Sequence, residues 1–203
     1  MINIRLFVAR HGETDFNKER RYLGSTDKPL NQRGLKQASQ LGKKLKTWKI
    51  DKIITSPLTR CIQTTEEINT FLKLDHLIMK EFRERSVGVY EGLTKDEIRN
   101  KYPTLWRRNI THIWDQAPPG GETINETYNR VSNGLNALKN KNKWASILLI
   151  THGFVSRCIN FYFNPNISTD EFFAYNLGNG KIEEYELIKS SQVTATQNRL
   201  SPT

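Results

Sequence analysis

Two short apolar runs in this chain end in the same way. The run over residues 4–9 is followed by Arg10-His11-Gly12, and the run over residues 146–150 is followed by Thr151-His152-Gly153. Runs of this length and apolarity are typical of strands buried on both faces of a sheet. Parallel strands end at one edge of their sheet, and the sites of open α/β domains lie at that edge. We therefore expect the two histidines to meet there.

The rest of the chain alternates between helical and strand-like segments. Apolar periodicity, capping residues and proline positions predict helices over 31–46, 59–72, 94–102, 123–139 and 153–163, and strands over 52–55 and 77–79. Residues 12–30 and 102–114 have no clean period and are expected to be irregular. Gly178-Asn179-Gly180 predicts a hairpin turn between strands over 174–177 and 181–187. The predicted fold class is α/β, a three-layer α/β/α arrangement around a mostly parallel central sheet.

Composition limits the partners that this chain could have. Its 31 Lys and Arg outnumber 21 Asp and Glu, a net charge of +10 that attracts anions. No apolar run approaches the roughly 20 residues of a membrane span, and none has the form of a signal peptide. Cys61 and Cys158 form neither a disulfide framework nor a zinc motif, so a reducing, cytoplasmic location is expected. The basic stretch 139–143 is interpreted as a solvated helix end, because no nucleic-acid motif accompanies it.

Residues near the strand ends could together transfer a phosphoryl group. A neutral imidazole such as that of His11 is a nucleophile, provided that a backbone carbonyl holds one ring N–H and leaves the other nitrogen free. Arg10 and Arg60 carry the planar guanidinium that suits phosphate, and His152 could add a donor. Glu84 could protonate a departing alcohol. Each residue alone has an ordinary structural interpretation, and their joint occurrence favours the catalytic one.

These residues stand in a series of motifs that resembles the histidine phosphatase superfamily, the phosphoglycerate mutase-like or RHG group. The resemblance covers about residues 3–188. The matching motifs are Arg10-His11-Gly12-Glu13-Thr14 with Asn17, residues 24–30, Arg33-Gly34 with Gln37-Ala38, Ser56-Pro57-Leu58-Thr59-Arg60 with Gln63-Thr64, Glu84 with Gly88 and Glu91-Gly92, residues 119–123, and Thr151-His152-Gly153.

The resemblance implies a role for each matching residue. It makes His11 the phosphorylated nucleophile and Glu84 the proton donor, with Glu91 as the second choice. Leu23 departs from the family, in which many members have a polar residue before the matching glycine. A polar contact to substrate is therefore expected to be lost there. The remaining implied site residues are Arg10, Arg60 and His152 in the phosphate pocket, Asn17 and the N–H of Gly153 as further phosphate contacts, and Gly24 near the pocket mouth.

The resemblance also implies how the chain is organised. Residues 1–188 are expected to be a single domain, in which an insertion over about 82–122 forms a small helical cap above the pocket. Residues 189–203, rich in Ser, Thr and Gln, are expected to be a flexible tail. Aromatic residues in or near the cap could line the substrate, although packing within the cap is the favoured interpretation; they are Phe82, Tyr102, Trp106 and Trp114. His76 and His112 are expected at the surface.

The expected function is that of a phosphomonoesterase acting on a small phosphorylated metabolite, with no metal, cofactor, nucleic acid or membrane involved. The nearest alternative is a phosphoglycerate mutase, which would need a larger cap and a tail that seals the site. A non-catalytic member that only binds phosphorylated ligands, and a nucleic-acid-binding module, are the alternatives from other classes. Phosphosugars, phosphoglycerates and the nucleotide-loop precursor of cobalamin all stay open as substrates, and so does the oligomeric state.

Overall fold

The computed structural model describes residues 3–141 and 143–188 and contains a central sheet of five strands. In sheet order these are β3 (His76–Ile78), β2 (Lys52–Thr55), β4 (Ser146–Thr151), β1 (Ile4–Arg10) and β5 (Ile182–Leu187). The first four run parallel, and β5 is antiparallel to β1. The central pair places Arg10 opposite Thr151, so the two His-Gly dipeptides leave the sheet side by side.

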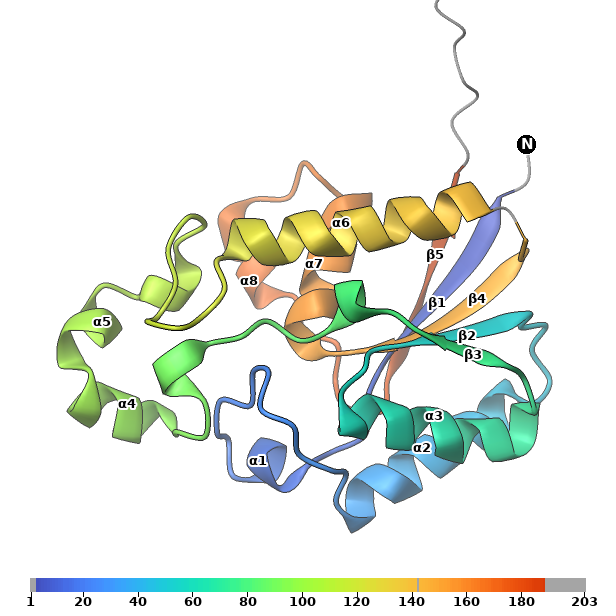
Figure 1. The fold of residues 1–203 in the computed structure, drawn as a ribbon, viewed down its shortest axis with the longest axis horizontal. Helices are drawn as coiled ribbons and strands as arrows, with labels where there is room; N and C mark the ends of the chain where they lie inside the picture. The colour runs from blue at the N-terminus through green and yellow to red at the C-terminus, as the bar shows by residue number, and fades with distance from the viewer. Residues whose placement is uncertain (1–2, 142, 189–203) are drawn as a thin grey trace, which may run out of the picture.

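Helices cover both faces of the sheet (Figure 1). Helices α6 (Ile124–Lys141), α7 (Gly153–Phe163) and α8 (Thr169–Ala174) lie on one face, and α2 (Gln32–Leu45) and α3 (Thr59–Leu72) lie on the other. The strand side chains alternate between these layers: Leu6 packs toward α6 and α7, whereas Phe7 packs toward α2 and α3. Each such side chain contributes roughly 1.5–3 kcal/mol through burial. The predicted fold class is confirmed.

The segment between β3 and α6 projects beyond the carboxyl edge of the sheet as a small helical cap (Figure 1). It contains η1 (Lys80–Phe82), η2 (Gly88–Tyr90), α4 (Lys95–Lys101), α5 (Pro103–Arg107) and η3 (Ile110–His112). It has a core of its own, in which Tyr90 and Ile98 are buried and Tyr102 and Trp106 pack against them. The favoured interpretation of these two aromatic residues, as packing groups, is therefore confirmed.

The strand predicted over 174–177 is wrong. Residues Thr169–Ala174 form α8, because Ser168 and Glu171 make a reciprocal capping box that starts a helix and Phe172 buries its ring in the core. Strand β5 consequently pairs with β1 and not with residues 174–177. The turn at 178–180 instead contacts the end of β1, since the N–H of Gly180 donates to the carbonyl of Arg10 over 3.1 Å.

Two other segments are more regular than their sequences indicated. The segment 12–30 contains a short helix, α1 (Asp15–Lys18), which Thr14 and Asn17 cap reciprocally. The segment 102–114 contains α5 and η3, and Pro103 occupies the first turn of α5, where a missing N–H costs nothing. The predicted helix over 59–72 is confirmed to the residue.

Among the helices of the described residues, none has both the length and the apolarity needed to cross a bilayer. The tail predicted over 189–203 lies outside the described residues.

Candidate active site

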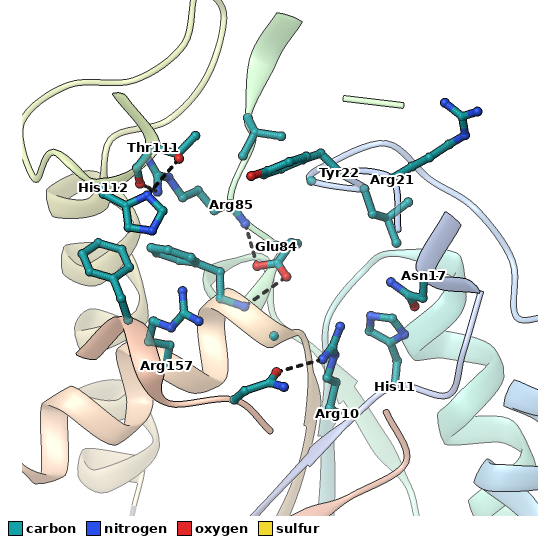
Figure 2. A pocket seen from close by; sticks show the side chains of 17 residues that line it. Arg10, His11, Asn17, Arg21, Tyr22, Glu84, Arg85, Thr111, His112 and Arg157 are labelled. Atoms are coloured by element: carbon teal, nitrogen blue, oxygen red, sulfur yellow. Dashed lines mark hydrogen bonds between the residues drawn. The ribbon is translucent and has the colours of Figure 1, made fainter. Parts of the chain in front are cut away.

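A cavity of about 370 Å³ opens at the carboxyl edge of β1 and β4, below the cap. Six of the sequence-predicted site residues line it: Arg10, His11, Asn17, Gly24, Glu84 and Gly153. Figure 2 shows the labelled members of this set converging from β1, the loop after it and the cap. Arg60 and His152 lie directly behind His11, whose ring centroid is 5.2 Å from that of His152.

His11 is held with one ring nitrogen free. Its side chain is 2% exposed, and Nδ1 lies 2.7 Å from the carbonyl oxygen of Gly12. A carbonyl oxygen only accepts, so Nδ1 carries the proton and Nε2 keeps its lone pair. Burial and the nearby guanidinium groups of Arg60 and Arg10 hold the pKa of His11 well below its ordinary value. The imidazole is therefore neutral, as a nucleophile must be.

The backbone around His11 is fixed by close packing. A Cβ on Gly12 would lie 2.3 Å from the carbonyl oxygen of Gly34, so only glycine allows the chain to approach the start of α2 here. The amide of Asn179 donates to the carbonyl of His11 over 3.1 Å, and the N–H of Gly12 donates to Thr64 Oγ1 over 3.1 Å. These contacts leave the imidazole little freedom to turn away from the cavity.

Arg10 presents a donor that has no protein partner. Its Nη1 donates to the carbonyl of Leu177 over 2.9 Å, whereas Nε is buried with no acceptor among the described residues. Buried donors are almost always paired, so this N–H is suited to an anion in the cavity. Burial lowers the pKa of the guanidinium, and Arg60 adds to this effect while Glu84 opposes it.

Arg60 and His152 form a fully buried pair that supports the floor of the site. Arg60 Nε donates to His152 Nδ1 over 3.2 Å. Because Nδ1 accepts, Nε2 of His152 carries the proton and donates to Ser56 Oγ, 2.6 Å away. Both ring nitrogens of His152 are thus engaged, unlike those of His11. Burial first, then Arg60 and His11, hold the pKa of His152 well below its usual value.

The two terminal nitrogens of the Arg60 guanidinium donate hydrogen bonds to the loop before α2. Nη1 donates to the carbonyl of Thr26 over 2.9 Å, and Nη2 donates to that of Gly24 over 2.8 Å. Gly24 adopts a φ of +52°, and a Cβ there would lie 2.4 Å from a carboxylate oxygen of Glu91. The backbone of Gly24 is therefore locked against the rim of the cavity.

Glu84 stands between the cap and the end of the cavity that Arg10 and His11 line. One carboxylate oxygen accepts a hydrogen bond from the backbone N–H of Arg85 over 2.9 Å. The other accepts from the backbone N–H of Phe154 over 3.2 Å. Phe154 belongs to the first turn of α7, whose free N–H groups favour a carboxylate. The carboxyl group is oriented by backbone alone and carries no ion pair among the described residues.

Glu91, the second choice for the proton donor, has a different environment. Its carboxylate accepts hydrogen bonds from Ser25, Thr26, Ser86 and the N–H of Val87, and it does not line the cavity. Burial alone would raise the pKa of this carboxyl, but the bonds from Thr26 and Ser25 hold it below its usual value. The geometry therefore favours Glu84 over Glu91.

Asn17 and Gly153 bring smaller polar groups to the end of the cavity that Arg10 and His11 line. Asn17 Oδ1 accepts from the N–H of Thr14 and from Asn179, each over 3.2 Å, which leaves its NH₂ group to the cavity. Gly153 is the first residue of α7, and a Cβ there would lie 3.2 Å from the guanidinium carbon of Arg10. A larger residue at 153 would press against Arg10.

Sequence reasoning missed several residues of this site. Ser56 was noted only as part of a motif, although its hydroxyl accepts the hydrogen bond from Nε2 of His152. His112, expected at the surface, is exposed yet lines the cavity. Leu23, which the sequence had already singled out, is buried in the cavity wall. The remaining unassigned lining residues are Arg21, Tyr22, Arg85, Val87, Thr111, Phe154, Arg157, Phe173 and Asn176. Two of these residues could have been found from the sequence. Arg85 directly follows Glu84, and Arg157 lies one turn after Gly153 in α7.

The described residues contain no group of three or more His, Cys, Asp or Glu side chains arranged to hold a metal ion. Cys61 and Cys158 are both free and buried, and burial raises the pKa of each thiol to about 12. Cys61 Sγ lies 3.5 Å from His152 Nε2, so this thiol packs against the floor of the site as a protonated, apolar group.

A comparison of the sequence with models of known protein families agrees with the fold, the cavity and the motifs. The sequence model of the histidine phosphatase superfamily (branch 1) matches residues 6–199, and the chain belongs to this superfamily.

Two relatives and one solved structure are examples of the proteins to which this chain is similar. The uncharacterized phosphatase PhoE of Bacillus subtilis strain 168 is 36% identical over 72% of this chain and 70% of its own length. The phosphoglycerate mutase-like protein 4 of Arabidopsis thaliana is 33% identical over 76% of this chain and 68% of its own. The alpha-ribazole phosphatase of Shigella flexneri shares the fold, with a TM-score of 0.80, 22% identity and 89% coverage of both chains. These names support an activity of the phosphatase or mutase type.

Proposed function

We propose that this protein is a metal-independent phosphomonoesterase, which hydrolyses a small phosphorylated metabolite through a phosphohistidine at Nε2 of His11. One observation carries the proposal. A buried, neutral histidine presents a free nitrogen to a cavity that also contains the unpaired Nε of Arg10 and the carboxyl group of Glu84. A nucleophile, an anion-binding donor and a proton donor thus share one space.

In the first step, the lone pair on His11 Nε2 forms a bond to phosphorus. The bond from phosphorus to the alcohol oxygen breaks, and its electron pair leaves with that oxygen. Glu84, in its protonated form, transfers its proton to the leaving oxygen, so that a neutral alcohol departs. The enzyme then carries the phosphoryl group on His11 and a carboxylate at Glu84.

In the second step, Glu84 acts as the base. Its carboxylate takes a proton from a water molecule while the water oxygen forms a bond to phosphorus. The bond from phosphorus to Nε2 breaks, and its electron pair returns to the imidazole. Inorganic phosphate leaves, and the protonated Glu84 and neutral His11 are restored for another turnover.

Positive charge and N–H donors would stabilise the transferring group. In the proposal the guanidinium groups of Arg10 and Arg60 supply the positive charge of the phosphate pocket, and neutral His152 orients Arg60 at its floor. Asn17 and the N–H of Gly153 add neutral donors. Fixed donors of this kind act strongly in a buried site because they need no reorganisation during the reaction. They would take the electrostatic role that a metal ion has in other phosphatases.

Rapid-quench trapping tests the proposal. Mixing the enzyme with a labelled phosphomonoester should give an acid-labile, base-stable phosphoenzyme that forms and decays at rates compatible with turnover. Activity should be unchanged by EDTA and inhibited by vanadate, a mimic of pentacoordinate phosphorus. Loss of activity on EDTA with recovery on Mg²⁺ or Zn²⁺, or turnover with no phosphoenzyme, would contradict the mechanism.

The mutase alternative has its own test. We incubate the enzyme with 3-phosphoglycerate, with and without 2,3-bisphosphoglycerate, and follow both phosphate release and formation of 2-phosphoglycerate. A phosphatase releases phosphate at least as fast as it interconverts the two isomers. Interconversion much faster than release would assign the protein to the mutase type.

A further inference from the structure

We infer that the cavity contains a second anion-binding subsite, formed by Arg85 and Arg157 on the cap side of Glu84, which binds a carboxylate on the leaving group of the substrate. The inference rests on the proposed function, since it names the class of alcohol that the phosphatase would release. It concerns residues that take no part in the phosphoryl-transfer steps described above.

Arg85 is the first of the two groups. It is 2% exposed, and it is held by Nε, which donates to the carbonyl of Glu122 over 2.8 Å, and by Nη1, which donates to that of Thr111 over 2.9 Å. Its Nη2 is buried without an acceptor among the described residues, although Arg85 lines the cavity. An unpaired buried N–H of a cation is costly, and a bound anion would remove that cost.

Arg157 is the second group. It lies on α7, and its Nε and Nη2 both donate to the carbonyl of Tyr175, over 3.2 and 3.0 Å. Within the part of the chain that the structure describes, Nη1 has no hydrogen-bond partner, and the residue lines the same cavity. Arg157 thus repeats the arrangement of Arg85: most of the guanidinium is anchored to backbone carbonyls, and one nitrogen is left over.

Phe154 brings the two cations together. The guanidinium carbon of Arg85 lies 4.7 Å from the centroid of its ring, and that of Arg157 lies 5.5 Å from it. The N–H of the same residue donates to Glu84. The pair of arginines is therefore placed next to the proton donor, where the leaving group must emerge.

Figure 2 shows this arrangement across the cavity. Arg85, His112 and Arg157 lie on one side of Glu84, while His11 and Arg10 lie on the other side. A phosphomonoester with its phosphorus at His11 and its ester oxygen at Glu84 would extend its alcohol portion toward the two arginines. The substrate would span the cavity with an anion at each end.

Among the described residues, no carboxylate lies within ion-pair distance of the guanidinium group of Arg85 or Arg157, and the side chain of Glu122 is taken by Arg130 at 2.6 Å. Burial lowers the pKa of Arg85 to about 10, so it stays charged near pH 7. One free N–H on each arginine matches the two oxygens of a single carboxylate.

The alternative is that Arg85 and Arg157 serve only to tie the cap and the segment after α8 to the sheet. Binding of non-hydrolysable phosphonates separates the two roles. We would measure by calorimetry the Kd of ω-carboxyalkyl phosphonates and of ω-hydroxyalkyl phosphonates of equal length, with two to five methylene groups. The wild-type protein should bind the carboxylate compound about ten- to a hundredfold more tightly at the length that spans the cavity.

Arg85→Gln and Arg157→Gln should each bring the ratio of the two Kd values close to one. Arg107→Gln is the matched control, because it removes the same charge from an exposed position of the cap outside the cavity. It should keep the wild-type ratio. Because the ratio compares two ligands on one sample, it does not depend on the fraction of folded protein. If Arg85→Gln fails to fold, Arg157→Gln and the wild-type ratio decide.

The outcomes for the subsite and for the proposed function can be told apart. Equal affinity for the carboxyl and hydroxyl compounds at every length in the wild-type protein would overturn the subsite, and so would a preference that both variants retain. Neither result affects hydrolysis of p-nitrophenyl phosphate, which has no carboxylate. Failure to hydrolyse any phosphomonoester would overturn the proposed function, while a carboxylate preference in binding would still support the subsite.

Discussion

The two strand ends that look alike in sequence have different surroundings. His11, after β1, has its Nδ1 proton held by the carbonyl of Gly12, and its Nε2 is free at the cavity. His152, after β4, accepts from Arg60 at one ring nitrogen and donates to Ser56 at the other. Among the described residues, the same His-Gly dipeptide thus leaves one ring nitrogen free toward the cavity in one place and engages both ring nitrogens in the other.

The chain beyond each histidine explains the difference. After His11 the backbone makes a loop that Gly12 packs tightly against Gly34, so a carbonyl is turned back toward the imidazole. After His152 the chain enters α7 at once, and the first turn of this helix supplies the N–H that orients Glu84. In the proposed mechanism, one strand end therefore provides the attacking atom, and the other supports the pocket and the acid.

Exchange of the two imidazoles for alanine should give the largest effects and separate the roles. We expect His11→Ala to lower kcat/KM by at least about a thousandfold and to form no phosphoenzyme, since the attacking atom is absent. His152→Ala should lower it by roughly a hundredfold and still form phosphoenzyme, slowly. Rapid-quench trapping of both variants measures the difference. A trapped phosphoenzyme in His11→Ala would reverse the assignment.

Glu84→Gln tests the acid that the second strand end positions. Proton donation matters most for a poor leaving group, so hydrolysis of an alkyl phosphate should fall by about 10²–10³. Hydrolysis of p-nitrophenyl phosphate should fall much less, because its leaving group needs little help. Glu91→Gln is the comparison variant, and its losses should be similar on both substrates, as for a residue that holds the rim together. Equal losses for Glu84→Gln on both substrates would indicate a structural role.

Local signals explain which parts of the fold were predictable. Asn31 caps α2 by accepting from the N–H of Gly34, and the boundary of that helix could be located from those neighbouring residues alone. The mostly parallel sheet was predictable as well, because short apolar runs alternate with helices along the chain. The prediction of a strand over 174–177 was wrong because the structure of this region depends on burial of Phe172 against residues far away in the sequence. Propensity cannot report such a contact.

The same distinction applies to the candidate site. The residues that line it at the strand ends, such as Arg10, His11 and Gly153, could be proposed from motifs and from the rule for parallel sheets, and their roles stay predictions. The link between Ser56 and His152 joins positions 96 residues apart. The unpaired nitrogen of Arg85 depends on two carbonyls elsewhere in the cap. No local pattern encodes either feature.

Ser56→Ala tests whether orientation of His152 matters for catalysis. The variant removes the acceptor of the Nε2 proton and leaves a buried N–H unpaired, at a cost of about 1–3 kcal/mol. We expect kcat to fall by about three- to tenfold with little change in KM, and Ser56→Thr to restore part of the loss. Ser146→Ala is the control, since that hydroxyl is buried with no partner among the described residues. If both alanine variants behave alike, the contact has no catalytic role.

The smallest effect concerns stability below neutral pH, where the two histidines should behave alike in spite of their different roles. Burial holds the pKa of each well below its ordinary value of about 6.5, so the native state excludes protons that the unfolded chain accepts. The free energy of unfolding should therefore fall as pH drops below 6.5, by up to about 1.4 kcal/mol per pH unit for each histidine. His11→Asn and His152→Asn should each remove one such contribution, and the double variant should remove both.

Urea unfolding between pH 5 and 7.5 gives the slopes of unfolding free energy against pH. His76→Asn, at an exposed position of β3, is the control. A single variant whose slope equals that of the wild-type protein would show that its histidine is protonated in the native state, and the neutral nucleophile would be lost with it if that histidine were His11.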